Sequence, residues 1–237
     1  LVLLGMAGES AAWEMAKAKI STPWAADVSP ENVHGEYPRP QMVREQWQNL
    51  NGLWQWQSLK QMTQELSETA WKEILVPFAP EAPLSGIGRH AESMAYRRTF
   101  NVPEAWKGER VLLHFEAVDW RCEAFVNGTS VGKHEGGYDP FTFDITEVIK
   151  GKVGEHELVL RVYDPTDNDA VPRGKQVLSP GGIFYTCTSG IWQTVWMEAV
   201  PQTYIADYHV ATDIDNGTAT FTVTAGGEAP AKGTTFI

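Results

Sequence analysis

Period-two alternation of apolar and polar residues restricts the fold of this chain more than any other feature of its sequence. Between residues 110 and 120, Val111, Leu113 and Phe115 fall on one side of an extended backbone, and His114 falls on the other. Successive side chains of a β-strand point to opposite faces, so this spacing is typical of a strand with one buried face. The segment is therefore predicted to be a half-buried strand.

A two-residue turn signal follows the next extended segment. Residues 123–126 run into Asn127-Gly128, and residues 129–133 form the returning segment. Both turn residues tolerate positive φ, which two-residue hairpin loops require. The sequence predicts a β-hairpin here. Further strands are predicted at 96–102, 157–163 and 191–200.

Helical patterns are scarce. Residues 61–71 could form two helical turns, but they are equally compatible with a polar loop. Several short strands separated by glycine and proline turns indicate an all-β sandwich. A jelly roll is the most economical form, because it closes two antiparallel sheets with few exposed edges.

A composition change near Pro201 suggests a domain boundary. Residues 204–215 alternate again, Asp215-Asn216-Gly217 is a turn signal, and residues 218–224 return. A two-stranded hairpin is marginal by itself, so it is expected to begin a second, truncated β-domain. The predicted domains are 37–201 for the jelly roll and 202–237 for this hairpin.

Charge and hydropathy exclude two classes of partner. The 237 residues carry a net charge of −11 and no basic run, whereas a nucleic-acid surface needs clustered cations. No apolar run approaches the roughly 20 residues of a membrane-spanning helix. Cys122 and Cys187 could form one bridge, but two buried thiols are the simpler expectation.

The first residues resemble the end of an export signal. Residues 1–12 are apolar and rich in small side chains, as the later part of a secretory signal is; a frayed arm is the alternative. Residues 1–36 are accordingly expected to be a signal remnant with an N-terminal arm, and a periplasmic or secreted location is expected.

No complete catalytic set is visible. Asp164, Asp167 and Asp169 could supply paired carboxylates or calcium ligands, but a solvated turn accounts for them. The six histidines show no paired metal-ligand spacing, and no Gly-x-Ser-x-Gly elbow occurs. No metal and no cofactor is predicted.

Aromatic and polar loop residues are the remaining local candidates. Trp192 and Trp196 share one face of a predicted strand and could stack on a sugar ring, although packing between two sheets would bury them without any ligand. The loop residues Arg173, Lys175 and Gln176 offer a guanidinium, an ammonium and an amide, and such loops often carry ligand contacts.

Five segments in order resemble glycoside hydrolase family 2. They are 47–54 (WQNLNGLW), 76–78 (VPF), 96–100 (YRRTF), 112–146 (LLHFEAVDWRCEAFVNGTSVGKHEGGYDPFTFDIT) and 190–198 (GIWQTVWME). The longest resembles the family's N-terminal sugar-binding domain almost throughout, and the hairpin after Pro201 resembles the start of its immunoglobulin-like domain.

The resemblance implies a β-galactosidase- or β-glucuronidase-like enzyme. Such an enzyme has a jelly roll, an immunoglobulin-like sandwich and a TIM barrel whose two glutamates perform retaining hydrolysis. No strand–helix alternation of a barrel is present here. The chain alone is thus expected to be inactive, to brace the barrel, and to lend loops to a cleft that binds a glycan. Its implied partners are the downstream domains of the same polypeptide; the whole enzyme could also form a homo-oligomer.

The resemblance transfers only part of the site. Some relatives contact the sugar through an aspartate six positions before the glycine of the closing motif, but Phe184 stands there before Gly190. The loop with Glu81 and Ser85 corresponds to one sent toward the cleft, and Tyr185 adjoins the missing aspartate. Loop-to-loop bonds or domain docking could equally explain these residues. The substrate-binding candidates are Glu81, Ser85, Arg173, Lys175, Gln176 and Tyr185. A stand-alone carbohydrate-binding module and a protein-interaction domain are the rival functions.

Overall fold

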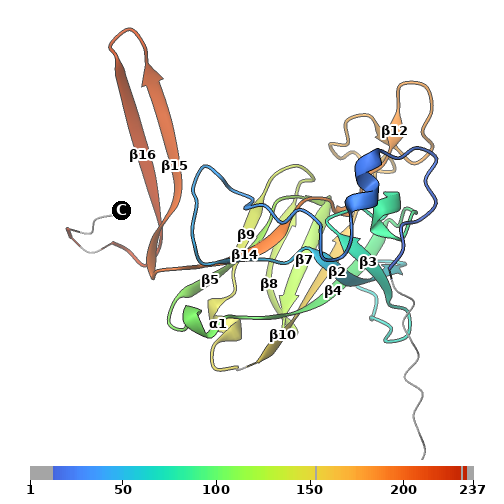
Figure 1. Ribbon diagram of the computed structural model, residues 1–237, viewed down its shortest axis with the longest axis horizontal. Helices are drawn as coiled ribbons and strands as arrows, with labels where there is room; N and C mark the ends of the chain where they lie inside the picture. Colours follow the sequence, from blue (N-terminus) through green and yellow to red (C-terminus); the bar gives the residue numbers. More distant parts are fainter. Residues whose placement is uncertain (1–12, 153, 231, 234–237) are drawn as a thin grey trace, which may run out of the picture.

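The computed structural model describes residues 13–152, 154–230 and 232–233, and most of them form a two-layer β-sandwich (Figure 1). One sheet has four strands in the order β1-β14-β5-β9, and the other has six in the order β3-β2-β4-β10-β7-β8. Neighbouring strands in both sheets are antiparallel. The prediction of an all-β sandwich is confirmed.

The elements are short and occur in an order typical of a sandwich with crossover connections. The strands of the two sheets are β1 (Trp47–Asn49), β2 (Gly52–Leu59), β3 (Lys72–Val76), β4 (Ser93–Asn101), β5 (Arg110–Phe115), β7 (Arg121–Val126), β8 (Thr129–Glu135), β9 (Phe141–Asp144), β10 (Glu155–Tyr163) and β14 (Val195–Val200). The smaller elements are η1 (Pro23–Asp27), η2 (Pro83–Ser85), η3 (Glu104–Trp106), α1 (Thr146–Ile149), β6 (Val118–Asp119), β11 (Gln176–Val177), β12 (Tyr185–Thr186) and β13 (Gly190–Ile191). Among the described residues, no helix has the length and apolar character needed to cross a bilayer.

The predicted hairpin is present. Asn127 and Gly128 join β7 to β8 with φ values of 50° and 79°, as a tight turn with two left-handed residues requires. Alternation also predicts the buried face of β10 correctly, since Leu158, Leu160 and Val162 are fully buried. Local turn chemistry and period-two patterning therefore explain this side of the six-stranded sheet.

Two sequence predictions need correction. Residues 110–120 do not form one half-buried strand: β5 ends at Phe115, and even its outward-facing His114 is 6% exposed. The segment 191–200 is divided between β13 and β14. Residues 61–71, which were compatible with either two helical turns or a loop, form a loop. β5 is buried on both faces because another segment of the chain covers its outer side. The alternation of residues within β5 gives no sign of that covering segment.

That covering segment is the part of the chain directly before β1, residues 37–46, which belongs to the range predicted for the jelly roll and which we call the arm from here on. Arg39 and Arg44 of the arm bind the Glu198 carboxylate of β14, with N···O distances of 2.9 Å and 2.5 Å. His114 Nε2 lies 3.1 Å from the same carboxylate, which is fully buried. Burial raises the pKa of Glu198, but the hydrogen bond from His114 and the arginine charges outweigh it and hold the pKa below its ordinary value. The ionised carboxylate thus holds the arm on the sheet.

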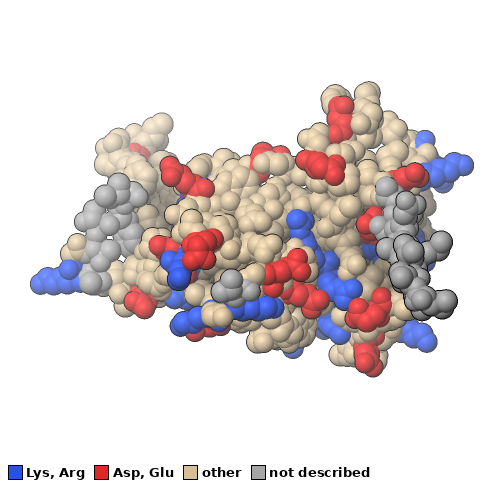
Figure 2. Space-filling view, turned by 60° about the horizontal axis from the view of Figure 1, so that its bottom comes forward, with Lys and Arg blue, Asp and Glu red and all other residues tan. Residues whose placement is uncertain are grey.

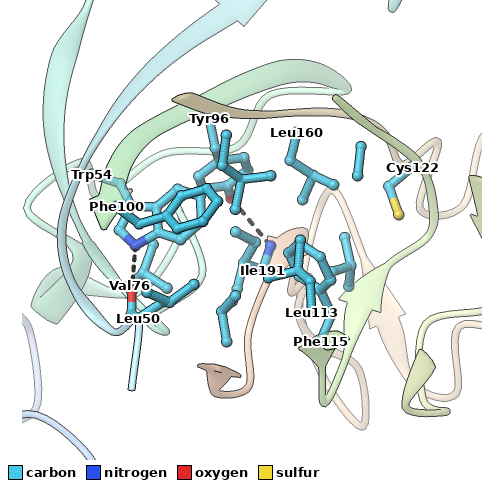
Figure 3. Packing of buried hydrophobic residues seen from close by; sticks show 14 of the residues in the cluster. Leu50, Trp54, Val76, Tyr96, Phe100, Leu113, Phe115, Cys122, Leu160 and Ile191 are labelled. Atoms are coloured by element: carbon cyan, nitrogen blue, oxygen red, sulfur yellow. Dashed lines mark hydrogen bonds between the residues drawn. The ribbon is translucent and has the colours of Figure 1, made fainter. Parts of the chain in front are cut away.

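The core lies between the two sheets (Figure 3). Trp54 of β2 donates its indole N–H to the Leu50 carbonyl at 2.8 Å, and the Ile191 N–H reaches the Tyr96 hydroxyl at 3.3 Å. Both aromatic side chains are buried. Their polar atoms are paired inside the core, so burial of these large side chains leaves neither group unsatisfied.

A separate hairpin follows the sandwich. β15 (Thr203–Asp213) and β16 (Thr218–Gly227) pair antiparallel and stand away from the two sheets (Figure 1). Several of their apolar side chains are exposed, including 66% of Phe221, whereas Tyr204, Ile205 and Val210 are half-buried. The second predicted hairpin is present. The suggested export signal, residues 1–12, lies outside the described residues and stays a prediction.

Candidate functional site

The most exposed candidates lie in the projecting loop, residues 164–189, which contains β11 and β12 at the end of the sandwich away from the β15–β16 hairpin (Figure 1). Gln176 and Tyr185 are opposite each other in the parallel β11–β12 pair. Tyr185 is 67% exposed and Lys175 is also exposed, whereas Arg173 is half-buried. Four of the six candidates are therefore brought together in one loop.

The two candidates from the other loop are buried. Ser85 has no exposed surface; its hydroxyl donates to the Pro80 carbonyl at 3.2 Å and accepts the Ile87 N–H at 3.0 Å. The Glu81 side chain is 5% exposed and faces inward. The resemblance suggested a loop directed toward a cleft, but these hydrogen bonds hold both side chains within the sandwich domain.

Glu81 instead belongs to the inner polar cluster, which we define as Glu81, His90, Cys187 and Ser189. Glu81 Oε1 lies 2.8 Å from His90 Nδ1 and accepts the Ser189 hydroxyl at 2.7 Å. Its other oxygen accepts the Ser189 N–H at 3.1 Å. Cys187 Sγ lies 3.4 Å from His90 Nδ1. The cluster joins the segment between β3 and β4 to the base of the projecting loop.

The cluster changes the protonation of its histidine. Burial alone would lower the pKa of His90, but hydrogen bonds and charge interactions with Cys187 and Glu81 more than offset it and raise the pKa to about 10. At neutral pH the imidazole ring is therefore cationic and neutralises part of the local negative charge.

Two buried aspartates adjoin the cluster. Asp164 follows β10, accepts the Thr166 N–H at 2.7 Å, and has a raised pKa because it is buried. Asp119 of β6 pairs with Gly190 of β13. Burial raises the pKa of Asp119 to about 7, and the charges of Asp164 and Glu81 contribute in the same direction.

We expect Asp119 to make the fold less stable as pH rises. The folded carboxyl keeps its proton until about pH 7, whereas an unfolded aspartate loses it near 3.8. The folded state binds more protons across that window, so the free energy of unfolding falls with increasing pH, by roughly 4 kcal/mol in total. Urea unfolding between about pH 4 and pH 8 should show this fall. Asp119→Asn should make the fall smaller and leave the part that is due to Asp164, whose pKa is raised in the same direction.

Asp167→Asn is the matched control, because it makes the same change at an aspartate that is exposed in the projecting loop. It should leave the pH profile of stability unchanged. Parallel profiles for the wild-type chain and Asp119→Asn would contradict the assignment of a protonated Asp119.

The aspartate trio of the loop has a structural role. Asp164 accepts from Thr166, Asp167 accepts the Leu178 N–H at 3.1 Å, and Asp169 accepts the Ala170 N–H at 2.7 Å. Asp164 and Asp169 stabilise local turns, and Asp167 joins two parts of the loop. The expected solvated turn is wrong for Asp164, which is 3% exposed.

The proposed aromatic platform is absent at Trp196. This side chain is 1% exposed, stacks on His114 at 4.0 Å between ring centroids, and lies under the Arg39 guanidinium. Trp192 is half-buried and lines a shallow groove with Tyr37 and other residues of the arm and the β3 end. The arm therefore covers the face of β14 that carries Trp196, the face on which a sugar ring could otherwise have stacked.

Charged side chains of both signs are spread over the visible surface (Figure 2). On the face shown in Figure 2, Lys and Arg side chains are interspersed with Asp and Glu side chains and form no continuous basic stripe.

Sequence reasoning missed the inner polar cluster. His90, Cys187 and Ser189 have no motif spacing, since almost one hundred positions separate the first from the other two. Only the pairing of strands brings them together. Cys187 and Cys122 are both free and buried. This confirms the expectation of two buried thiols rather than a disulfide bridge.

Comparison with known proteins places the sandwich in a family. Residues 71–201 match the model "Glycosyl hydrolases family 2, sugar binding domain". A β-galactosidase of Thermoanaerobacter pseudethanolicus is 37% identical over 130 residues, covering 54% of this chain and 17% of that protein. A β-glucuronidase of Bacteroides fragilis is 35% identical over 100 residues, covering 42% of this chain and 13% of the relative.

Solved structures agree. A β-glucuronidase from an uncultured Clostridium species superposes with a TM-score of 0.62 at 25% identity, covering 78% of this chain and 35% of that one. The chain thus spans only a fraction of the length of its relatives. Because the family model covers more than half of the residues and the sandwich superposes on a solved relative, the chain belongs to glycoside hydrolase family 2 and contains its sugar-binding domain.

Proposed function

We propose that this chain is the N-terminal part of a retaining glycoside hydrolase that acts on β-galactosides or β-glucuronides. The match over residues 71–201 carries the proposal, because similar proteins named β-galactosidase and β-glucuronidase contain the same domain within much longer chains. Hydrolysis itself needs two carboxylates of a catalytic domain. The sandwich would brace that domain, and the β15–β16 hairpin would begin the immunoglobulin-like domain between them.

The projecting loop is the part of this chain best placed to approach a substrate. It combines exposed apolar side chains with the polar groups of Lys175 and Gln176, and Tyr185 is its most exposed aromatic residue. Exposed apolar surface on a soluble domain marks contact with another domain or a ligand. We therefore assign the loop to the rim of the substrate cleft.

A kinetic experiment on the complete polypeptide tests this function. Tyr185→Ser should lower kcat/KM for an aryl β-galactoside or β-glucuronide by about tenfold, which corresponds to roughly 1.4 kcal/mol of lost binding. The melting temperature should be unchanged, because the removed ring is largely in solvent. The 237-residue chain alone should release no aryl alcohol.

The control is Val43→Ser, which removes a side chain that is 68% exposed on the arm rather than on the loop. It should leave kcat/KM unchanged. Turnover by the isolated chain would contradict the bracing function. If the isolated chain binds galactosides or glucuronides in calorimetry, and the complete polypeptide does not hydrolyse them, the rival function of a carbohydrate-binding module is correct.

A further inference from the structure

We infer that Glu81, His90 and Cys187 bind one zinc-type divalent cation. Among the described residues, one carboxylate oxygen, one imidazole nitrogen and one thiol sulfur from these three side chains all lie within 4.8 Å of one another. They come from two segments of the chain, the connection between β3 and β4 and the base of the projecting loop. The site would thus add a further link between two parts of the fold that are already joined by the backbone hydrogen bond from Asp164 N–H to the Glu92 carbonyl, at 2.8 Å.

The distances between these atoms approximate a metal site. His90 Nδ1 lies 2.8 Å from Glu81 Oε1 and 3.4 Å from Cys187 Sγ, and Cys187 Sγ lies 3.7 Å from Glu81 Oε1. Tetrahedral zinc places its nitrogen and oxygen ligands about 3.3 Å apart and its sulfur about 3.6 Å from either. Two of the three edges already agree to within a few tenths of an ångström, and the carboxylate needs to move by about half an ångström.

The chemistry of the three donors selects the cation. Thiolate and imidazole are preferred by zinc and similar transition metals, whereas calcium and magnesium prefer oxygen ligands alone. Cys187 is 5% exposed, as is the Glu81 side chain, but the His90 side chain is 26% exposed. An ion could therefore enter from the His90 side, where a water molecule would complete four ligands.

Hydrogen bonding around the site orients its ligands. The Ser189 N–H donates to Glu81 Oε2 at 3.1 Å and leaves Oε1 directed toward His90 and Cys187. By contrast, three acceptors surround His90 Nδ1, since Ser189 Oγ is also 3.1 Å away. One ring nitrogen carries at most one hydrogen, so a proton can serve only one of these contacts well. A metal cation would displace the protons of the His90 ring and the Cys187 thiol into solvent, and it would then be bound by the carboxylate, the ring nitrogen and the thiolate together.

Cobalt substitution tests the inference on the purified 237-residue chain. After removal of metals by a chelator, titration with Co²⁺ should saturate at one equivalent and produce the thiolate-to-cobalt charge-transfer absorption together with tetrahedral d–d bands. Excess Zn²⁺ should abolish both and raise the melting temperature. Cys187→Ala and His90→Gln should each weaken Co²⁺ binding by more than about 100-fold.

Matched controls use residues of the same types outside the cluster. Cys122 and His156 are buried in other parts of the sandwich, so Cys122→Ala and His156→Gln should retain the cobalt spectrum. In the wild-type chain, Zn²⁺ should also protect Cys187 from alkylation, which keeps the test valid if a variant does not fold. Absence of the charge-transfer band, its persistence in Cys187→Ala, or alkylation of Cys187 unaffected by Zn²⁺ would each overturn the inference.

Discussion

Gly190→Ala is expected to destabilise the sandwich by more than about 4 kcal/mol, enough to prevent folding of a domain of ordinary stability. Gly190 has a φ of +69°, and an added Cβ would overlap the Tyr96 hydroxyl and lie 2.9 Å from Met94 Sδ. Tyr96 is fully buried in β4, so it has no space into which to move. Urea unfolding followed by tryptophan fluorescence measures the loss.

Gly128→Ala separates backbone strain from overlap. Gly128 has a φ of +79°, but nothing lies within 4 Å of an added Cβ, and the cost there should be about 1 kcal/mol. In addition, Tyr96→Phe removes the overlapping hydroxyl and should recover part of the stability lost in Gly190→Ala. Equal losses for Gly190→Ala and Gly128→Ala would show that the close approach to Tyr96 is unimportant.

Glu198→Ala is the second substitution with a large expected effect, about 3 to 5 kcal/mol. Glu198 is fully buried and accepts from Arg39, Arg44 and His114. Removing the carboxylate leaves two guanidinium groups facing a buried position without their counter-charge. The arm should then detach from the four-stranded sheet, which limited proteolysis between residues 37 and 46 would detect.

Glu147→Ala is the control, because it removes an ion pair that is exposed to solvent rather than buried. Glu147 and Lys150 are 3.0 Å apart, but their side chains are 76% and 70% exposed. Such a pair contributes at most about 1 kcal/mol. If Glu198→Ala costs no more than Glu147→Ala and the arm is cleaved no faster, the arm is held by other contacts.

The fold could be predicted largely from local patterns. The alternation in 157–163, the Asn127-Gly128 turn and the hairpin after Pro201 all depend on neighbours in sequence, and all three are present. The strands β1, β2, β3 and β9 were missed. In β9, Phe141 and Phe143 do alternate with polar residues, but the strand has only four residues, too few for a clear periodic signal. β5 was predicted to have one side facing solvent, whereas both sides are buried. No pattern in its own sequence indicates that the arm covers it.

The candidate site was predictable only in part. The projecting loop was found from its polar residues and from the family resemblance. Ser85 and Glu81 were assigned to a ligand, although their hydrogen bonds keep them inside the domain. His90 was not singled out, because its partners at positions 187 and 189 are remote in sequence.

The sequence by itself determined that this chain is an all-β sandwich of a glycoside hydrolase family. Side-chain alternation, turn residues and family motifs are each formed by residues that are close together in the sequence. Only the tertiary structure decided which polar groups are buried together. Glu198 meets the arm, and Glu81 meets His90 and Cys187, through contacts between segments that are far apart in the chain. Burial and proximity, which set the protonation and ligand chemistry of these groups, arise from packing in three dimensions and leave no periodic trace in the sequence.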